Sequence, residues 1–92
     1  MDEILKLGTV VKISEPEGEV MIIGYYPQDP ETGKIYTYLG ISPVYGISFK
    51  EEAVFFNQDL ILEKVFDGYS DEVSDRFRNK ISECMRTPID NS

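Results

Sequence analysis

The chain lacks histidine and tryptophan, and it has a single cysteine, Cys84. Because histidine is the commonest general base and metal ligand near neutral pH, its absence excludes most pairings of a nucleophile with a base. One cysteine cannot form an internal disulfide, and it falls short of the roughly four ligands that a structural zinc ion requires. Cys84 falls near the apolar stripe of a predicted C-terminal helix, where a thiol packs as a small hydrophobe. The sequence therefore predicts no metal site and no catalytic cysteine.

Basic residues are also scarce, since nine lysines and arginines face seventeen aspartates and glutamates, for a formal net charge of -8. Such a chain repels phosphate backbones and anionic lipids, so neither nucleic acid nor membrane is an expected partner. No apolar run approaches the ~20 residues that span a bilayer. The acidic first residues, Asp2 and Glu3, do not fit a secretory signal, and the single cysteine agrees with a reducing compartment. Both features predict a cytoplasmic protein.

Glycine-rich motifs that cradle phosphates are missing, as are calcium-binding loops, so no cofactor is expected. Pairs of carboxylates do occur, at Glu51 with Glu52 and at Asp67 with Asp71. Two carboxylates can act as acid and base in a hydrolase, but an acidic chain produces such pairs by chance. Solvent-facing charge is the favoured interpretation, and the protein is expected not to be an enzyme.

The composition fits one folded domain over residues 1–92, because 41% hydrophobic and 12% aromatic residues are enough to form a core. Turn residues divide the chain into short apolar runs that are rich in β-branched side chains, as in strands. The predicted strands cover residues 8–13, 19–26, 34–41, 53–56 and 60–66. The run at 19–26 is apolar at consecutive positions, which places it centrally in the sheet.

A helix is predicted at about residues 71–86, where the period of the apolar residues changes. Val73, Phe77, Ile81 and Met85 recur every four residues, and Ser70 is a suitable N-cap. Proline then ends the helix, and residues 87–92 form a tail. The predicted fold is therefore α+β: a small, mostly antiparallel sheet of about five strands, or a partly open barrel, with one C-terminal amphipathic helix.

Tyrosine is the most distinctive residue type, because six tyrosines are more than a core of this size requires. A tyrosine combines a large apolar body with a polar tip, which suits half-wet contacts between proteins. Alternation along 34–41 predicts Tyr36 and Tyr38 on one face of that strand, opposite Leu39. The tyrosines either cover the sheet under the helix or form a binding face. The candidate protein-binding residues are Tyr25, Tyr26, Tyr36, Tyr38, Tyr45 and Tyr69.

Several segments in order resemble the domain of unknown function 4176 family, small proteins encoded with LXG toxins in type VII secretion loci of Gram-positive bacteria. They are Leu7-Gly8-Thr9-Val10-Val11, Val20-Met21-Ile22-Ile23-Gly24, Tyr36-Thr37-Tyr38-Leu39-Gly40, and Phe55-Phe56-Asn57-Gln58-Asp59-Leu60 running on to Val65-Phe66-Asp67-Gly68-Tyr69. The chain departs from the family pattern at Lys6, Thr37 and Gln58, where proline, an acid and histidine are usual.

The resemblance implies a non-catalytic accessory protein, a chaperone or targeting adaptor for an LXG-type toxin or its small helical partners. We expect a tyrosine-bearing sheet face, or a free strand edge, to bind an amphipathic helical segment with a basic surface. One alternative is an immunity protein whose acidic charge imitates nucleic acid toward a toxin domain. The other is a carboxylate-dependent hydrolase, which requires a concave pocket with convergent acids.

Overall fold

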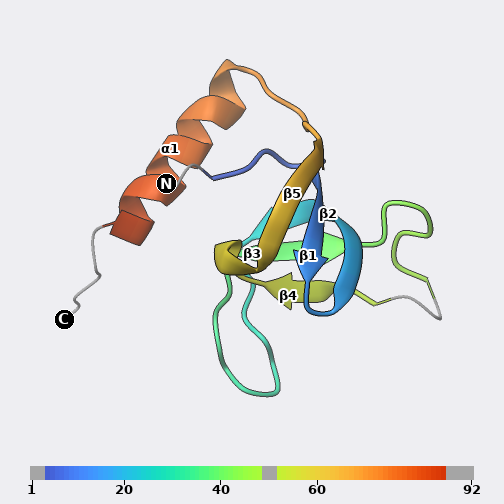
Figure 1. Cartoon of the computed structure of the whole chain (residues 1–92). Helices are drawn as coiled ribbons and strands as arrows, with labels where there is room; N and C mark the ends of the chain where they lie inside the picture. Colours follow the sequence, from blue (N-terminus) through green and yellow to red (C-terminus); the bar gives the residue numbers. More distant parts are fainter. Residues whose placement is uncertain (1–3, 49–51, 87–92) are drawn as a thin grey trace.

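A computed structural model describes residues 4–48 and 52–86, with the side chains of residues 85 and 86 left out (Figure 1). It contains one five-stranded sheet and one α-helix. The strands are β1 Val10–Ser14, β2 Glu17–Tyr25, β3 Tyr38–Ile41, β4 Val54–Phe56 and β5 Ile61–Phe66; η1, a single 3₁₀ turn, covers Gln58–Leu60 and α1 covers Glu72–Arg86. The strand order is β4-β3-β2-β1-β5 and every neighbouring pair is antiparallel. The predicted α+β class is confirmed, and the sheet is not closed into a barrel.

β1 and β2 form a hairpin, in which Ser14 pairs with Glu17 across a two-residue turn. β2 lies between β1 and β3, as its unbroken apolar run predicts. Val20 and Ile22 are buried, whereas Met21 and Ile23 are only partly covered. A strand in this position has a neighbour on each edge, so its backbone hydrogen bonds are satisfied on both sides.

The alternation predicted for β3 is confirmed within Tyr38–Ile41, where Tyr38 and Gly40 are buried and Leu39 and Ile41 are partly covered, whereas Tyr36 precedes the strand. The register shifts between Ile22 and Gly24, so that Tyr25 stands opposite Tyr38. The Tyr38 ring points into the core, where its exposed fraction is 0%, and Ile35 is 59% exposed. The bulge adds one residue to β2, so it changes which side chains of β2 meet the core beyond Ile22 and leaves the alternation of β3 intact.

The core lies on one face of the curled sheet and is closed by the N-terminal segment. Its buried hydrophobic residues are Ile4, Val11, Ile13, Val20, Ile22, Tyr38, Phe56 and Ile81. The Tyr25 hydroxyl donates to the Leu5 carbonyl oxygen at 2.7 Å, and the Leu5 N–H donates to the Tyr38 hydroxyl at 3.1 Å. These two bonds hold the N-terminal segment over the sheet, next to α1 (Figure 1).

α1 begins one residue later than predicted, and its cap is Asp71 rather than Ser70. The Asp71 carboxylate accepts from the Ser74 N–H at 2.7 Å, and the Ser74 hydroxyl accepts from the Asp71 N–H at 2.9 Å. Such reciprocal bonds satisfy two backbone donors of the first turn. The Ser70 hydroxyl instead donates to the Asp75 carboxylate at 2.9 Å. Among the described residues, no helix is long and apolar enough to cross a membrane.

Candidate protein-binding surface

The six candidate tyrosines do not share one surface. Tyr38 is fully buried, so its ring is unavailable to a partner, contrary to the prediction. Its hydroxyl donates to the Gln58 side chain at 2.5 Å, which ties β3 to η1. Tyr36 is partly covered and packs against Phe55 with ring centroids 5.7 Å apart. Tyr26 is 38% exposed, and burial, followed by the nearby Cys84 thiol, raises its pKa.

Tyr45 stands on a structured turn between β3 and β4. The Ser42 hydroxyl accepts from the N–H groups of Val44 and Tyr45, at 3.2 and 3.0 Å, and the Gly46 N–H donates to the Ser42 carbonyl at 2.9 Å. Gly46 adopts a positive φ of 64°, which only glycine adopts without strain. The turn leaves Val44 76% and Tyr45 68% exposed, so two apolar side chains project from a fixed backbone.

α1 packs through a narrower strip than its sequence predicts. Ile81 is 8% exposed, but Val73 is 65% and Phe77 54% exposed, and the side chain of Met85 lies outside the described part of the chain. Cys84 is exposed instead of packed, because the contact of α1 with the core is centred on Ile81. About half of the expected apolar stripe is therefore open to solvent.

The open part of the stripe adjoins two candidate tyrosines and forms a continuous apolar surface with them. Phe77 contacts Tyr25, with ring centroids 5.9 Å apart. Around this contact, Leu7, Tyr25, Tyr69, Ser74, Phe77 and Arg78 line a shallow hollow of about 40 Å³. Val73 precedes Phe77 by one helical turn, so the two lie on the same side of α1. We call Leu7, Tyr25, Tyr69, Val73 and Phe77 the α1 patch.

The backbone beneath the α1 patch is fixed by a close crossing of two chain segments. The Tyr69 N–H donates to the Leu7 carbonyl at 2.8 Å, and the Gly68 N–H donates to the Thr9 hydroxyl at 3.1 Å. Thr9 is fully buried. A Cβ atom at Gly68 would lie 2.2 Å from the Leu7 oxygen, so only glycine allows this approach. Leu7 and Tyr69 are thus held side by side before any partner binds.

The polar ends of the patch tyrosines have partners within the protein. The Tyr69 hydroxyl donates to the Asp71 carboxylate at 2.5 Å, and this bond raises the pKa of Tyr69. Burial raises the pKa of Tyr25, although the positive charge of Arg78 opposes the change. Both hydroxyls are therefore neutral near pH 7, and the rings present apolar faces to the outside.

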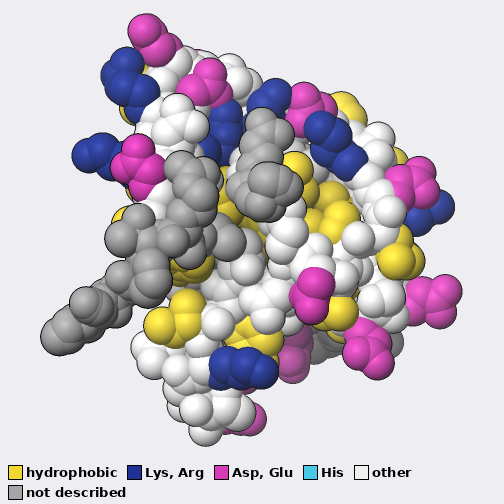
Figure 2. Space-filling view, turned by 60° about the vertical axis from the view of Figure 1, so that its left-hand side comes forward, with side chains coloured by type: hydrophobic (Ala, Val, Ile, Leu, Met, Phe, Trp, Pro, Cys, Tyr) yellow, Lys and Arg dark blue, Asp and Glu magenta, His cyan; other side chains and the backbone are white. Residues whose placement is uncertain are grey.

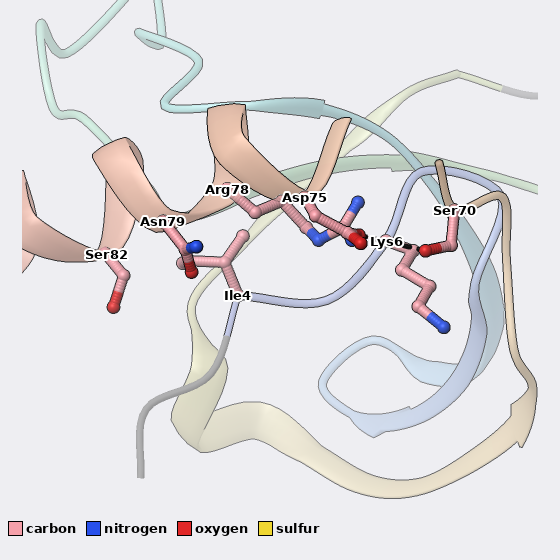
Figure 3. Close-up of a pocket in the computed structure, with 7 residues that line it drawn as sticks. All are labelled: Ile4, Lys6, Ser70, Asp75, Arg78, Asn79 and Ser82. Atoms are coloured by element: carbon pink, nitrogen blue, oxygen red, sulfur yellow. Dashed lines mark hydrogen bonds and ion pairs between the residues drawn. The ribbon is translucent and has the colours of Figure 1, made fainter. Parts of the chain in front are cut away.

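A polar hollow of about 340 Å³ lies between α1 and the N-terminal segment (Figure 3). Its described lining residues are Ile4, Lys6, Ser70, Asp75, Arg78, Asn79 and Ser82. Asp75 forms an ion pair with Arg78, and Lys6 pairs with Asp67 at 2.8 Å. Each charged side chain of the hollow thus has an ionic partner, which for Lys6 is Asp67 just outside the hollow. On the face drawn in Figure 2, charges of both signs are interspersed among hydrophobic side chains.

Asp67 and Asp71 do not have the properties of a general acid. Hydrogen bonds from Lys6 and then Lys64 lower the pKa of Asp67, and the hydrogen bond from Tyr69 lowers that of Asp71. A general acid needs a raised pKa, because it must hold a proton near neutrality. Of the other predicted pair, Glu52 is exposed, and Glu51 lies outside the described residues.

The free edge of the sheet at β5 is a poorer docking site than the α1 patch. The register of β5 against β1 shifts twice, and the shifts leave Leu62 and Val65 without a directly opposite residue. Bulges twist an edge strand and interrupt its regular row of hydrogen-bonding groups, which discourages a further strand from pairing. The β5 edge is therefore poorly suited to strand addition.

Sequence reasoning missed three members of the α1 patch: Leu7, Val73 and Phe77. The signal was present, because Val73 and Phe77 stand one turn apart in the predicted stripe. A periodic stripe is normally assigned to the core, so their exposure follows only from the position of α1. Leu7 carries no such signal, since a single apolar residue before a glycine is common.

Comparison with known proteins identifies a family for the chain. The model of a domain of unknown function (DUF4176) matches residues 4–77, which include all five residues of the α1 patch. No protein of curated function and no solved structure matches the chain.

Proposed function

Because the chain belongs to the DUF4176 family, a domain of unknown function, we propose a role from its surface: a non-catalytic accessory protein that binds a protein partner in the cytoplasm. The resemblance noted above supplies the partner, an LXG-type toxin of a type VII secretion system or one of its small helical companions. The protein acts on it as a chaperone or targeting adaptor.

The α1 patch is the observation that carries this proposal. Three of its side chains, Tyr69, Val73 and Phe77, are each more than half exposed, at 63%, 65% and 54%. Exposed apolar residues that gather in one place mark interaction sites more often than scattered ones do. Aromatic residues contribute disproportionately to binding free energy, especially on a surface that is ordered beforehand.

The shape of the α1 patch suits a helical segment. Phe77 of α1 lines a shallow hollow together with Leu7 and Tyr69, and Val73 extends the apolar side of α1 by one turn beyond it. A helix that carries apolar residues one turn apart can lie along such a wall and place one side chain in the hollow. The hollow of about 40 Å³ has room for the tip of a single apolar side chain.

The test is a binding measurement with the N-terminal LXG region of the neighbouring toxin, by size-exclusion chromatography and calorimetry. The double variant Val73→Ser with Phe77→Ser should weaken binding by at least about tenfold, since each exposed anchor contributes about 1 kcal/mol or more. Tyr45→Ser removes an aromatic ring that is also more than half exposed, in another part of the molecule, and is the matched control. Wild-type affinity in the double variant, or equal losses in all variants, would reject the α1 patch.

The net charge of -8 favours a second candidate function, an immunity protein that covers the basic surface of a toxin nuclease. Separate toxin fragments distinguish the two functions. An adaptor binds the N-terminal LXG region, whereas an immunity protein binds the C-terminal toxic domain and protects cells that express it.

A further inference from the structure

The face of the sheet turned away from the core carries a row of apolar side chains across four strands. In the register of the sheet, Val10 stands opposite both Phe66 and Met21, and Met21 stands opposite Ile41. Residues that stand opposite one another in an antiparallel pair project from the same face. We call Phe66, Val10, Met21 and Ile41 the outer row. None of the four is buried, and Phe66 is 63% exposed.

The apolar character extends beyond the outer row toward β4. Leu39, two residues from Ile41 and so on the same face, stands opposite Phe55, and both are partly exposed. Phe55 in turn contacts the ring of Tyr36. The outer face therefore presents a broad apolar area. The opposite face of the sheet is the one that α1 and the N-terminal segment cover.

The other margin of the outer row is acidic. Lys12 stands opposite both Glu19 and Glu63, and Ser14 stands opposite Glu17, all on the outer face and all exposed. Three carboxylates against one lysine leave this margin with a net negative charge. A partner that covers the outer row would meet this charge along one side only, because the other side continues as Leu39 and Phe55.

We propose that the outer face is a second docking surface, and that its occupant is an amphipathic helix of another protein with lysines or arginines along one border of its apolar stripe. The outer row crosses four strands and so spans about 14 Å, which matches about ten residues of α-helix. In this arrangement, the apolar stripe of the partner helix covers the outer row, and its basic border lies over Glu17, Glu19 and Glu63. Charge complementarity then fixes which way round the helix lies.

This surface shares no residue with the α1 patch, so the two proposals can fail separately. The chain would use one apolar surface on each side of its sheet, as a bridge between two proteins would.

The probe is a pair of fluorescent, helix-forming synthetic peptides with the same leucine stripe, one bordered by lysine and one by glutamate. The intact protein should bind the lysine peptide at least about tenfold more tightly, and added salt should reduce the difference. Met21→Thr with Phe66→Thr should weaken binding of the lysine peptide by about tenfold or more. Glu19→Gln with Glu63→Gln, which changes only exposed side chains, should reduce the preference between the peptides without unfolding the protein. Val73→Ser with Phe77→Ser should leave both affinities unchanged.

Equal affinity for the two peptides, or no binding of either, would overturn the proposal. So would a loss of binding in the Val73 and Phe77 variant that the Met21 and Phe66 variant does not show. A dimer in light scattering that the Met21 and Phe66 substitutions convert to a monomer would identify a second copy of the chain as the occupant, which also overturns it.

Discussion

Gly68→Ala should be among the most damaging single changes in the chain. The added Cβ atom would lie 2.2 Å from the Leu7 carbonyl oxygen, 2.5 Å from the Thr9 nitrogen and 2.8 Å from the Gly8 carbonyl carbon. All three are backbone atoms, so no side chain can rotate away, and the two segments must separate. Their separation stretches the bonds that join Gly68 to Thr9 and Tyr69 to Leu7.

The expected loss follows from the cost of overpacking, which is typically ~1–3 kcal/mol and sometimes more. With three backbone contacts below van der Waals distance, we expect a loss near ~3 kcal/mol in the free energy of unfolding. For a domain of this size, that loss lowers the melting temperature by about 12–24 °C. Because domains are stable by only ~5–15 kcal/mol, the variant should still fold at low temperature.

Thermal denaturation followed by circular dichroism measures this effect, and Gly24→Ala is the matched control. A Cβ atom at Gly24 would meet the Leu39 side chain at 3.6 Å, an ordinary contact. The control should therefore change the free energy of unfolding by no more than ~0.5 kcal/mol. If Gly68→Ala melted within about 4 °C of the wild type, the crossing of the two segments would not be as close as described.

Three further predictions concern the helix cap, the core and pH. Asp71→Ala should lower the free energy of unfolding, measured by urea denaturation, by about 1 kcal/mol because it removes the N-cap. Ser70→Ala should lower it clearly less. The reverse order would show that Ser70 is the cap. Tyr38→Phe removes the hydroxyl that accepts from Leu5 and should cost about 1–2 kcal/mol in the same assay, and an unchanged stability would contradict that bond. Because the pKa of Asp67 is lowered in the folded protein, its ionised form stabilises the fold above the unfolded pKa, and this contribution is lost as pH falls through the folded pKa. Asp67→Asn should therefore make the loss of stability below about pH 4 shallower. Identical pH profiles of the wild type and the variant would count against the ion pairs.

Most of the fold can be predicted from local sequence patterns. β1, β2, β5 and α1 each fall within one or two residues of the expected positions, because β-branched runs, turn residues and helical periodicity are local signals. β3 is shorter than expected, since residues 34–37 join residues 26–29 through an isolated bridge and a few backbone hydrogen bonds and not through a regular ladder. Within β3 the two faces alternate as expected, but the alternation alone does not say which face meets the core.

The candidate surface was harder to predict, because it depends on where α1 comes to rest. Nothing in the spacing of Val73 and Phe77 distinguishes a buried stripe from an open one. Their exposure results from a third segment, the N-terminal residues around Leu5, which lies against the core beside α1. The ring of Tyr69 is exposed and that of Tyr38 is buried, a difference that follows from their places in the fold.

Nuclear magnetic resonance mapping of the complex tests the central claim most directly. Isotope-labelled protein is titrated with the N-terminal LXG region, and the methyl and aromatic signals are followed. The account predicts the largest changes at Leu7, Tyr69, Val73 and Phe77. Changes confined to Val44 and Tyr45, with those four signals unmoved, would contradict it.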